Sequence, residues 1–318
     1  MQSIATNITT LYADLLQFAD PVGGVLPATI KTKKIKGTEQ VYASVKHGAT
    51  RIEQYLGPKG SDEVERYAQS RKQAQAIAKD HQATITMLRR AGMLAPPVAI
   101  GRIFEVLSRA GLFQRGLVLS GTHAFRLYPL ALGVTWPGAA FATNDIDISA
   151  ASFAEAGEPI DLGEVLARAS DNGIEPQWHT DLNLPARFMI GTAGLDVITR
   201  SKRGRKSPVA IDALNVAAEA LPFQEYLTER TFDVIALYGS GVRIRIPEPA
   251  RFAVHKLIVA QRRPARAVKR QKDLDQAKAI RDALEFLGDE HEFETALEDA
   301  QQRGRAWRRD INASLKEL

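Results

Sequence analysis

The chain has 318 residues, of which 45% are hydrophobic and 25% charged, and it contains no cysteine. These values are ordinary for a globular protein, and the lack of cysteine excludes a disulfide framework and thiolate metal sites. The sequence has no apolar run of about 18–20 residues and no secretory signal pattern, so we expect a cytoplasmic protein without a membrane partner. The net charge of +5 favours polyanionic partners such as nucleotides or nucleic acid.

The first 95 residues predict a helix, a small antiparallel sheet and a second, longer helix. The first helix is expected over residues 8–20. Three β-like stretches follow at residues 28–35, 40–45 and 50–56. Gly37 separates the first two, as a meander requires, and a polar helix then runs from a cap at Ser61 to about Arg90. This region has three possible roles: it presents an acceptor, forms a dimer contact, or covers the core. Covering the core is the simplest.

The middle of the chain predicts an α+β core. We expect a helix over residues 98–110, a buried strand at 116–120, a helix at 123–132, and strands at 141–149, 186–190 and 195–199, the last two as a hairpin. Beyond Pro208 we expect helices, over residues 249–261, 272–288 and at the C-terminus, with Val242–Ile246 as the one strand. The predicted units are residues 1–95, a catalytic core at 96–205, and a mainly helical unit at 206–318.

Two aspartates stand two positions apart at Asp145 and Asp147. Residues two apart in a strand point to the same face, so both carboxylates project together while Ile146 and Ile148 face a core. Adjacent carboxylates repel each other, and a cation relieves that cost. Magnesium prefers carboxylate oxygen, water and phosphate, so the pair is a candidate metal site, although the pattern alone is weak support.

The turn Ser120-Gly121-Thr122 follows the predicted buried strand. A glycine there lets a phosphate approach the backbone, and the next helix offers free N–H groups. The hydroxyl groups of Ser120 and Thr122 are further donors to phosphate oxygen. Taken alone, these residues are better explained as an ordinary turn between a strand and a helix.

Asp196 is a charged residue inside the apolar segment Gly194–Thr199. A metal shared with Asp145 and Asp147 would neutralise it, and so would an ion pair with an arginine such as Arg187 or Arg200. Together, three carboxylates suit two ions that activate an attacking hydroxyl and stabilise a pyrophosphate leaving group.

These motifs resemble the signature of the DNA polymerase β nucleotidyltransferase superfamily: Gly121-Thr122, then Asp145-Ile-Asp147, then Asp196. The chain further resembles a bacterial family of nucleotidyltransferase-fold proteins through segments 54–58, 221–227 and 246–277. The resemblance covers residues 25–290 and implies a mixed sheet flanked by helices, with the three aspartates as catalytic metal ligands. Superfamily members usually place the aspartate pair closer to the turn. Here residues 123–144 intervene, and 133–140 look like an inserted loop.

A basic block follows, with twelve lysines and arginines against three acids from Arg243 to Arg281. The resemblance implies that Lys256 and Arg262 contact the triphosphate, together with Ser120, Gly121 and Thr122. Lys256 is favoured over Lys272, because Lys272 and Asp273 read as a structural pair. His123 is expected to cap or pack rather than to take part in catalysis.

The predicted function is transfer of a nucleoside monophosphate from a nucleoside triphosphate (NTP), with Mg²⁺ or Mn²⁺, to a macromolecular acceptor. An RNA 3′ end, such as that of tRNA, and a protein hydroxyl are both open as acceptors. A role as a toxin or defence component rests on fold-level analogy. The alternative is a non-catalytic nucleic-acid-binding or regulatory protein on the same fold.

Overall fold

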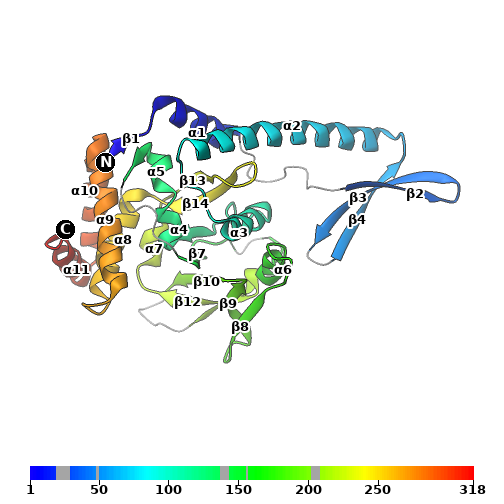
Figure 1. Ribbon diagram of the computed structural model, residues 1–318. Helices are drawn as coiled ribbons and strands as arrows, with labels where there is room; N and C mark the ends of the chain where they lie inside the picture. The colour runs from blue at the N-terminus through cyan, green and yellow to red at the C-terminus, as the bar shows by residue number, and fades with distance from the viewer. Residues whose placement is uncertain (19–28, 48–49, 137–142, 155–156, 202–207) are drawn as a thin grey trace.

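The computed structural model describes the chain except for residues 19–28, 48–49, 137–142, 155–156 and 202–207. The fold is α+β, with a mixed sheet flanked by helices, as expected (Figure 1). No described helix combines the length and the apolar composition that crossing a membrane requires.

The N-terminal region matches its prediction closely. It comprises β1 (Gln2–Ser3), α1 (Thr6–Phe18), β2 (Thr29–Ile35), β3 (Thr38–His47), β4 (Thr50–Pro58) and α2 (Asp62–Arg90). The strands β2, β3 and β4 form an antiparallel meander. Lys36 and Gly37 join β2 to β3 with φ values of 47° and 85°, a left-handed pair that favours glycine and forms a tight hairpin.

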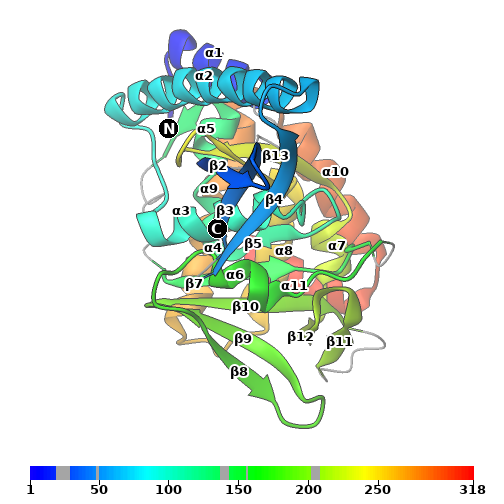
Figure 2. The ribbon, with the colours of Figure 1, turned by 90° about the vertical axis from the view of Figure 1, so that its right-hand side faces the viewer.

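Helix α2 packs along one side, as its apolar stripe predicts. Ile85 and Leu88 are buried near its C-terminal end, where a small core forms with Tyr12 and Leu15 of α1. Ser61 stands at the cap position, but its hydroxyl has no hydrogen-bond partner among the described residues. Figures 1 and 2 show α1 and α2 on one side of the molecule and the sheet strands β8, β9 and β10 on the opposite side.

The central sheet holds the strands that carry the predicted site. They are β5 (Val118–Ser120), β7 (Asp145–Ser149), β8 (Glu175–His179), β9 (Leu184–Ile190), β10 (Ala193–Arg200), β11 (Val209–Ile211) and β12 (Val216–Leu221). The order is β11-β12-β10-β7-β5, with β9 and β8 added beside β10. Strand β10 runs parallel to β7 and to β12, while β9 and β10 form the predicted antiparallel hairpin.

The remaining elements surround this sheet. They are α3 (Val98–Arg109), α4 (Gly121–Phe125), α5 (Tyr128–Leu132), β6 (Val134–Thr135), α6 (Leu162–Ala167), the 3₁₀ turn η2 (Asp212–Leu214), α7 (Gln224–Thr228), β13 (Thr231–Ala236), β14 (Val242–Pro247), α8 (Pro249–Gln261), α9 (Val268–Leu287), α10 (Glu290–Gln302) and α11 (Arg305–Leu315). Helix α8 has the predicted bounds, and most of its residues are buried because α9, α10 and α11 pack around it.

Two expectations for these elements are wrong. The helix expected over residues 123–132 is two short helices, because Pro129, in the first turn of α5, lacks the N–H that would continue the helix hydrogen bonds back to Phe125. The stretch after Pro208 contains β11, β12 and β13 as well as the expected strand near Val242. The alanine-rich sequence of β12 suits a helix locally, but its pairing with β10 makes it a strand.

The expected strand at 141–149 is β7 from Asp145 onward, and its first two residues lie outside the described residues. The expected loop at 133–140 is described only over 133–136, where Val134–Thr135 form β6. The division of the chain at residues 96 and 206 stays a prediction.

Candidate active site

Strand β7 presents its two aspartates on one face, as the alternation predicts. Ile146 and Ile148 are fully buried in the core, whereas Asp145 is exposed and Asp147 partly exposed. The period of two in a strand separates the apolar side chains from the carboxylates, so the same five residues build both core and site.

Asp196 lies beside Asp147 because β10 and β7 are parallel neighbours. Their register pairs Asp196 with Asp147 and Gly194 with Asp145. Paired residues on adjacent strands project from the same face, about 4.8 Å apart at the backbone. The pairing of strands thus brings together two carboxylates that are distant in sequence.

The Ser120-Gly121 turn lies directly against Asp147. Strand β5 pairs with β7 so that Ser120 is opposite Asp147, and the Ser120 hydroxyl donates to the Asp147 carbonyl oxygen at 3.2 Å. Gly121 has φ of +64°, and a Cβ added there would lie 2.1 Å from Oδ2 of Asp147. Only glycine leaves room for the carboxylate at this turn. Ser120 and Thr122 are themselves buried.

Arg187 occupies the space between two of the carboxylates. Its Nη2 donates to Oδ1 of Asp145 at 2.5 Å, and its Nη1 donates to Oδ2 of Asp196. The ion pair with Arg187, which the sequence left open as a partner for Asp196, is therefore formed. As the side chains stand, no three His, Asp or Glu residues in the described part of the chain are gathered to hold a metal ion.

The pKa of Asp147 is raised, first because burial penalises its charge and further because Asp196 and Asp145 are negative; Lys256 opposes this. Burial also raises the pKa of Asp196, and Arg187 opposes the shift. The site therefore concentrates negative charge in a poorly hydrated place, where a cation is favourable.

A cavity of about 290 Å³ opens beside Asp147. It is lined by four of the five predicted nucleotide-binding residues, namely Ser120, Gly121, Lys256 and Arg262. Thr122 does not line it. Its volume is just below the usual range for ligand pockets, about 300–1,000 Å³.

The lysine and arginines of this cavity are held by acidic partners. Lys256 Nζ is 2.6 Å from Oδ1 of Asp273, and Arg263 Nε is 2.5 Å from Oδ2 of the same residue. Arg262 pairs with Asp310 at 2.5 Å. Asp273 thus anchors α9 to α8, as expected for a structural residue. Asp273 forms ion pairs with Lys256 and Arg263, and the neighbouring Lys272 that the sequence suggested interacts with it electrostatically.

A family model described as nucleotidyltransferase matches residues 99–302. The chain belongs to this nucleotidyltransferase family. The match includes the three aspartates, the Gly121 turn and the lining of the cavity. No curated protein and no solved structure matches the chain.

Two residues of this nucleotidyltransferase that line the cavity were not singled out from the sequence. Phe223 has a left-handed backbone, with φ of 70°, and its ring meets Trp307 edge-on at 4.7 Å. Oε1 of the buried Gln224 has no hydrogen-bond partner among the described residues. Both lie in segment 221–227, which carried part of the family resemblance. That resemblance was the feature of the sequence that could have pointed to them.

Arg187 was named from the sequence only as a partner for Asp196. Its position opposite Asp196 could be predicted from the hairpin. The two-residue turn at Gly191-Thr192 pairs Ile190 with Ala193, and hence Arg187 with Asp196. Its contact with Asp145 could not be predicted, since it also depends on the pairing of β10 with β7.

The histidines near the site are neutral and packed. His123 is buried against Phe104, with ring centroids 5.8 Å apart, and burial lowers its pKa to about 4. His255 lines the cavity, and burial lowers its pKa to about 3. The expected packing role of His123 is confirmed.

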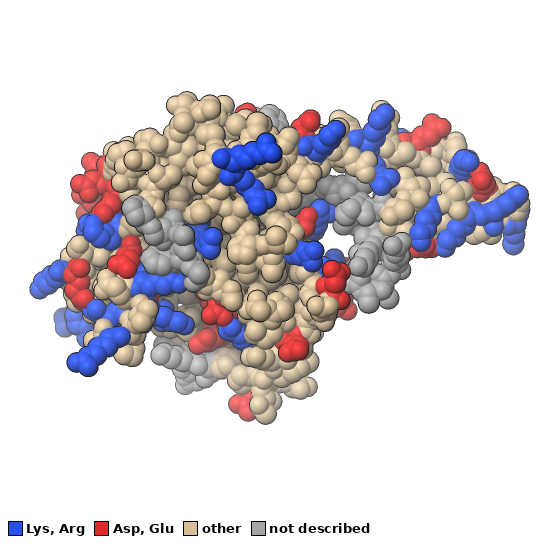
Figure 3. All heavy atoms as spheres, viewed as in Figure 1, with Lys and Arg blue, Asp and Glu red and all other residues tan. Residues whose placement is uncertain are grey.

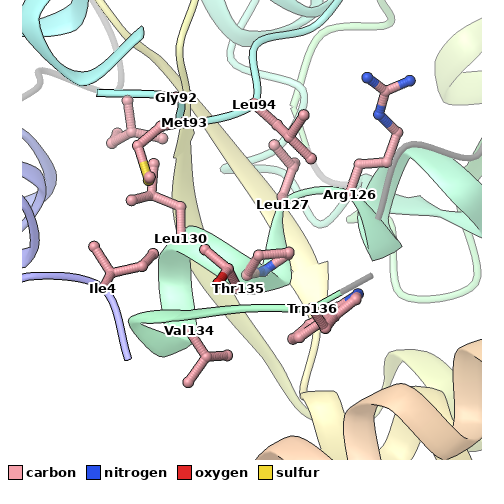
Figure 4. Close-up of a pocket in the computed structure, with 12 residues that line it drawn as sticks. Ile4, Gly92, Met93, Leu94, Arg126, Leu127, Leu130, Val134, Thr135 and Trp136 are labelled. Atoms are coloured by element: carbon pink, nitrogen blue, oxygen red, sulfur yellow. The ribbon is translucent and has the colours of Figure 1, made fainter. Parts of the chain in front are cut away.

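A second cavity, of about 230 Å³, lies apart from the aspartates (Figure 4). Ile4, Met93, Leu130 and Trp136 are among its largely apolar lining. None of the predicted site residues lines it.

Proposed function

We propose that this protein transfers a nucleoside monophosphate from an NTP to a macromolecular acceptor and releases pyrophosphate. In this proposal Asp145, Asp147 and Asp196 hold divalent metal ions, Mg²⁺ or Mn²⁺. Ser120, Gly121, Thr122, Lys256 and Arg262 bind the nucleotide. We further propose that the sheet and its Gly121 turn form a polymerase β-like core.

One observation carries the proposal: Asp147 and Asp196 are paired on adjacent parallel strands beside Gly121, and Asp147 lines a cavity with basic side chains. The carboxylates supply oxygen ligands, and Lys256 and Arg262 supply positive charge for phosphate oxygens. The backbone at Gly121 is close enough to Asp147 that a metal-bound phosphate would meet both.

The residues fit a divalent cation by their chemistry. Three carboxylates and no nitrogen or sulfur ligand form a hard oxygen donor set, which suits Mg²⁺ or Mn²⁺. The pKa values of Asp147 and Asp196 are raised first by burial and then by repulsion from the other carboxylates, and a cation would stabilise their charged forms. Arg187 is their counter-ion in the structure, so a cation that binds both Asp145 and Asp196 must displace its guanidinium.

The reaction forms one bond and breaks one. The acceptor oxygen bonds to the α-phosphorus, the bond from that phosphorus to the bridging oxygen breaks, and pyrophosphate leaves with that oxygen. Bound metal ions would lower the pKa of the acceptor hydroxyl and neutralise the leaving group. In this proposal Asp196 accepts the hydroxyl proton, and Lys256 and Arg262 hold the departing phosphates.

The acceptor is an RNA 3′ end, such as that of tRNA, or a protein hydroxyl. Both offer a hydroxyl nucleophile, and the basic character of residues 243–281 favours a polyanion. The proposal includes action as a toxin or defence component only by analogy of fold.

Incubation with each labelled NTP, Mg²⁺ and either total RNA or a cell lysate tests the proposal. Label should appear on a macromolecule with the wild type and with Asp80→Asn, an exposed carboxylate on α2 that serves as a matched control. Label should be lost with Asp147→Asn. Equal labelling by wild type and Asp147→Asn would overturn the assignment of the site.

A non-catalytic binding protein on the same fold is the second candidate. It is supported by Arg187, which already neutralises Asp145 and Asp196 without a metal ion. No labelling with any of the four NTPs, together with salt-sensitive RNA binding that Asp147→Asn leaves unchanged, would favour this candidate.

A further inference from the structure

The β2–β3–β4 meander has one face that is largely exposed, although Ser44 on that face is 3% exposed. Val41 and Ala43 of β3 are 3% and 2% exposed on the covered face, and α2 packs against β4. The other face, which we call the outer face, presents Lys31, Lys33, Gln40, Tyr42, Glu53 and Tyr55. Register pairs Lys31 with Tyr42 and Tyr42 with Tyr55, so these side chains form one row across the three strands.

Two aromatic rings form the centre of the outer face. The rings of Tyr42 and Tyr55 have centroids 5.3 Å apart, and Tyr55 is 52% exposed. The Tyr55 hydroxyl donates to Oε1 of Gln40 at 2.5 Å, which fixes the ring on the surface. An aromatic ring that is exposed and held in one position offers a flat surface on which a planar group can stack.

Lysines frame these rings. Lys33 Nζ lies 5.0 Å from the centre of the Tyr42 ring. Lys33 donates to one oxygen of Glu53 and Lys31 to the other, at 3.2 Å for Lys31. Two ammonium groups therefore share one carboxylate, and the group as a whole keeps a positive charge.

The meander is the basic end of the molecule. Residues 29–60 contain seven lysines and arginines and two glutamates. Their net charge of +5 equals that of the whole chain. Figure 1 shows the meander beyond the end of α2, away from the catalytic sheet, and Figure 3 shows lysine and arginine gathered at that end.

We propose that the outer face of the meander binds single-stranded nucleic acid, with bases stacked on Tyr42 and Tyr55 and phosphates held by Lys31 and Lys33. Its role would be to hold the acceptor strand for the active site, and this acceptor role rests on the proposed function. Every base has a face that stacks on an aromatic ring, and each phosphate offers an anion to a lysine. An acidic protein would be attracted by the same charge, but its side chains would make no comparable use of the exposed rings.

Binding of a short fluorescein-labelled RNA strand to the full chain, measured by anisotropy at several salt concentrations, tests this assignment. Tyr42→Ala/Tyr55→Ala should weaken binding by about tenfold or more, because stacking is lost. Tyr42→Phe/Tyr55→Phe should bind nearly as the wild type does, which separates stacking from folding defects. A DNA strand of the same sequence, run alongside, tells whether the 2′-hydroxyl contributes.

The lysines should change the salt dependence. Lys31→Gln/Lys33→Gln should reduce the slope of log K against log salt by about 1.4, since each phosphate contact to a single strand contributes about 0.7. Glu53→Gln should tighten binding several-fold, because it releases both lysines. Lys72→Gln/Lys79→Gln removes the same charge from exposed positions of α2 and should leave binding nearly unchanged.

The outcomes separate the two proposals. Absence of strand binding by the wild type at low salt, wild-type affinity of Tyr42→Ala/Tyr55→Ala, or weaker binding by Glu53→Gln would each overturn the role of the outer face. If Tyr42→Ala/Tyr55→Ala binds RNA as the wild type does and still transfers label, the outer face has no role and the proposed transferase activity stands. If strand binding follows the expected pattern but no NTP labels any acceptor, the outer face stands and the transferase fails.

Discussion

The guanidinium of Arg187 crosses over Gly194 to reach Asp145 on strand β7. A Cβ at position 194 would lie 2.0 Å from Nη2 of Arg187, so the missing side chain opens the path from β9 across β10 to Asp145 on β7. Through this path one arginine neutralises two carboxylates on two different strands. Arg187 therefore competes with any cation that binds the same oxygens.

Arg187→Met should tighten binding of Mn²⁺ several-fold, because Asp145 and Asp196 lose their internal counter-ion. Titration calorimetry on the metal-free protein measures the change. Arg200→Met is a matched control, since Arg200 pairs with Glu225 away from the aspartates. Weaker Mn²⁺ binding by Arg187→Met would show that the arginine supports the metal site instead of competing with it.

Gly194→Ala tests the same relationship without removing any charge. The new methyl group should push the flexible end of Arg187 away from Asp145 and reproduce the tighter Mn²⁺ binding. The loss in unfolding free energy should stay below about 1 kcal/mol, because the ion pairs are partly exposed to water. Unchanged Mn²⁺ affinity would contradict the idea that the path over Gly194 matters.

Gly121→Ala should damage both stability and transfer. A left-handed φ of +64° costs an alanine about 1–2 kcal/mol, and its Cβ would collide with Oδ2 of Asp147. We expect a lower midpoint in urea and transfer reduced by about a hundredfold or more, since a displaced ligand disturbs the reacting geometry. Gly173→Ala is a matched control: its φ is +82°, but nothing lies within 4 Å of the added Cβ. Equal transfer by the two variants would argue against the contact with Asp147.

Asp147→Asn should abolish transfer and yet stabilise the metal-free protein. The raised pKa of Asp147 means that its ionised form is disfavoured by burial and by its acidic neighbours, and asparagine carries no charge. We expect Asp147→Asn to melt at a higher temperature than the wild type without metal. Mn²⁺ should reduce this difference. A destabilised variant would indicate that Asp147 is satisfied by protein contacts alone.

Stability should fall as the pH drops below 6.5. Burial lowers the pKa of His255 from 6.5 to about 3 and that of His123 to about 4, so the unfolded chain takes up these protons first. The stabilisation is present above pH 6.5 and is lost toward pH 4, by about 1.4 kcal/mol per pH unit for each histidine. Urea unfolding across this range should give a flatter dependence for His255→Gln. An identical dependence in the variant would exclude His255 as a contributor.

Local sequence rules placed much of the site. Alternation in β7 put Asp145 and Asp147 on one face, and the position of Pro249 predicted the start of α8. The two-residue turn of the β9–β10 hairpin put Arg187 opposite Asp196. Each of these depends on contacts between residues near in sequence, where backbone geometry leaves few choices.

The sequence by itself therefore determined which residues are candidates for the chemistry, because residue type and local period act over a few positions. Only the tertiary structure decided that β7 and β10 are parallel neighbours with Asp147 beside Asp196, that Arg187 reaches Asp145, and that Lys256 pairs with Asp273. It also made β12 a strand against its local preference. Such pairings depend on which distant segments bury their apolar faces together, and no local pattern encodes that choice.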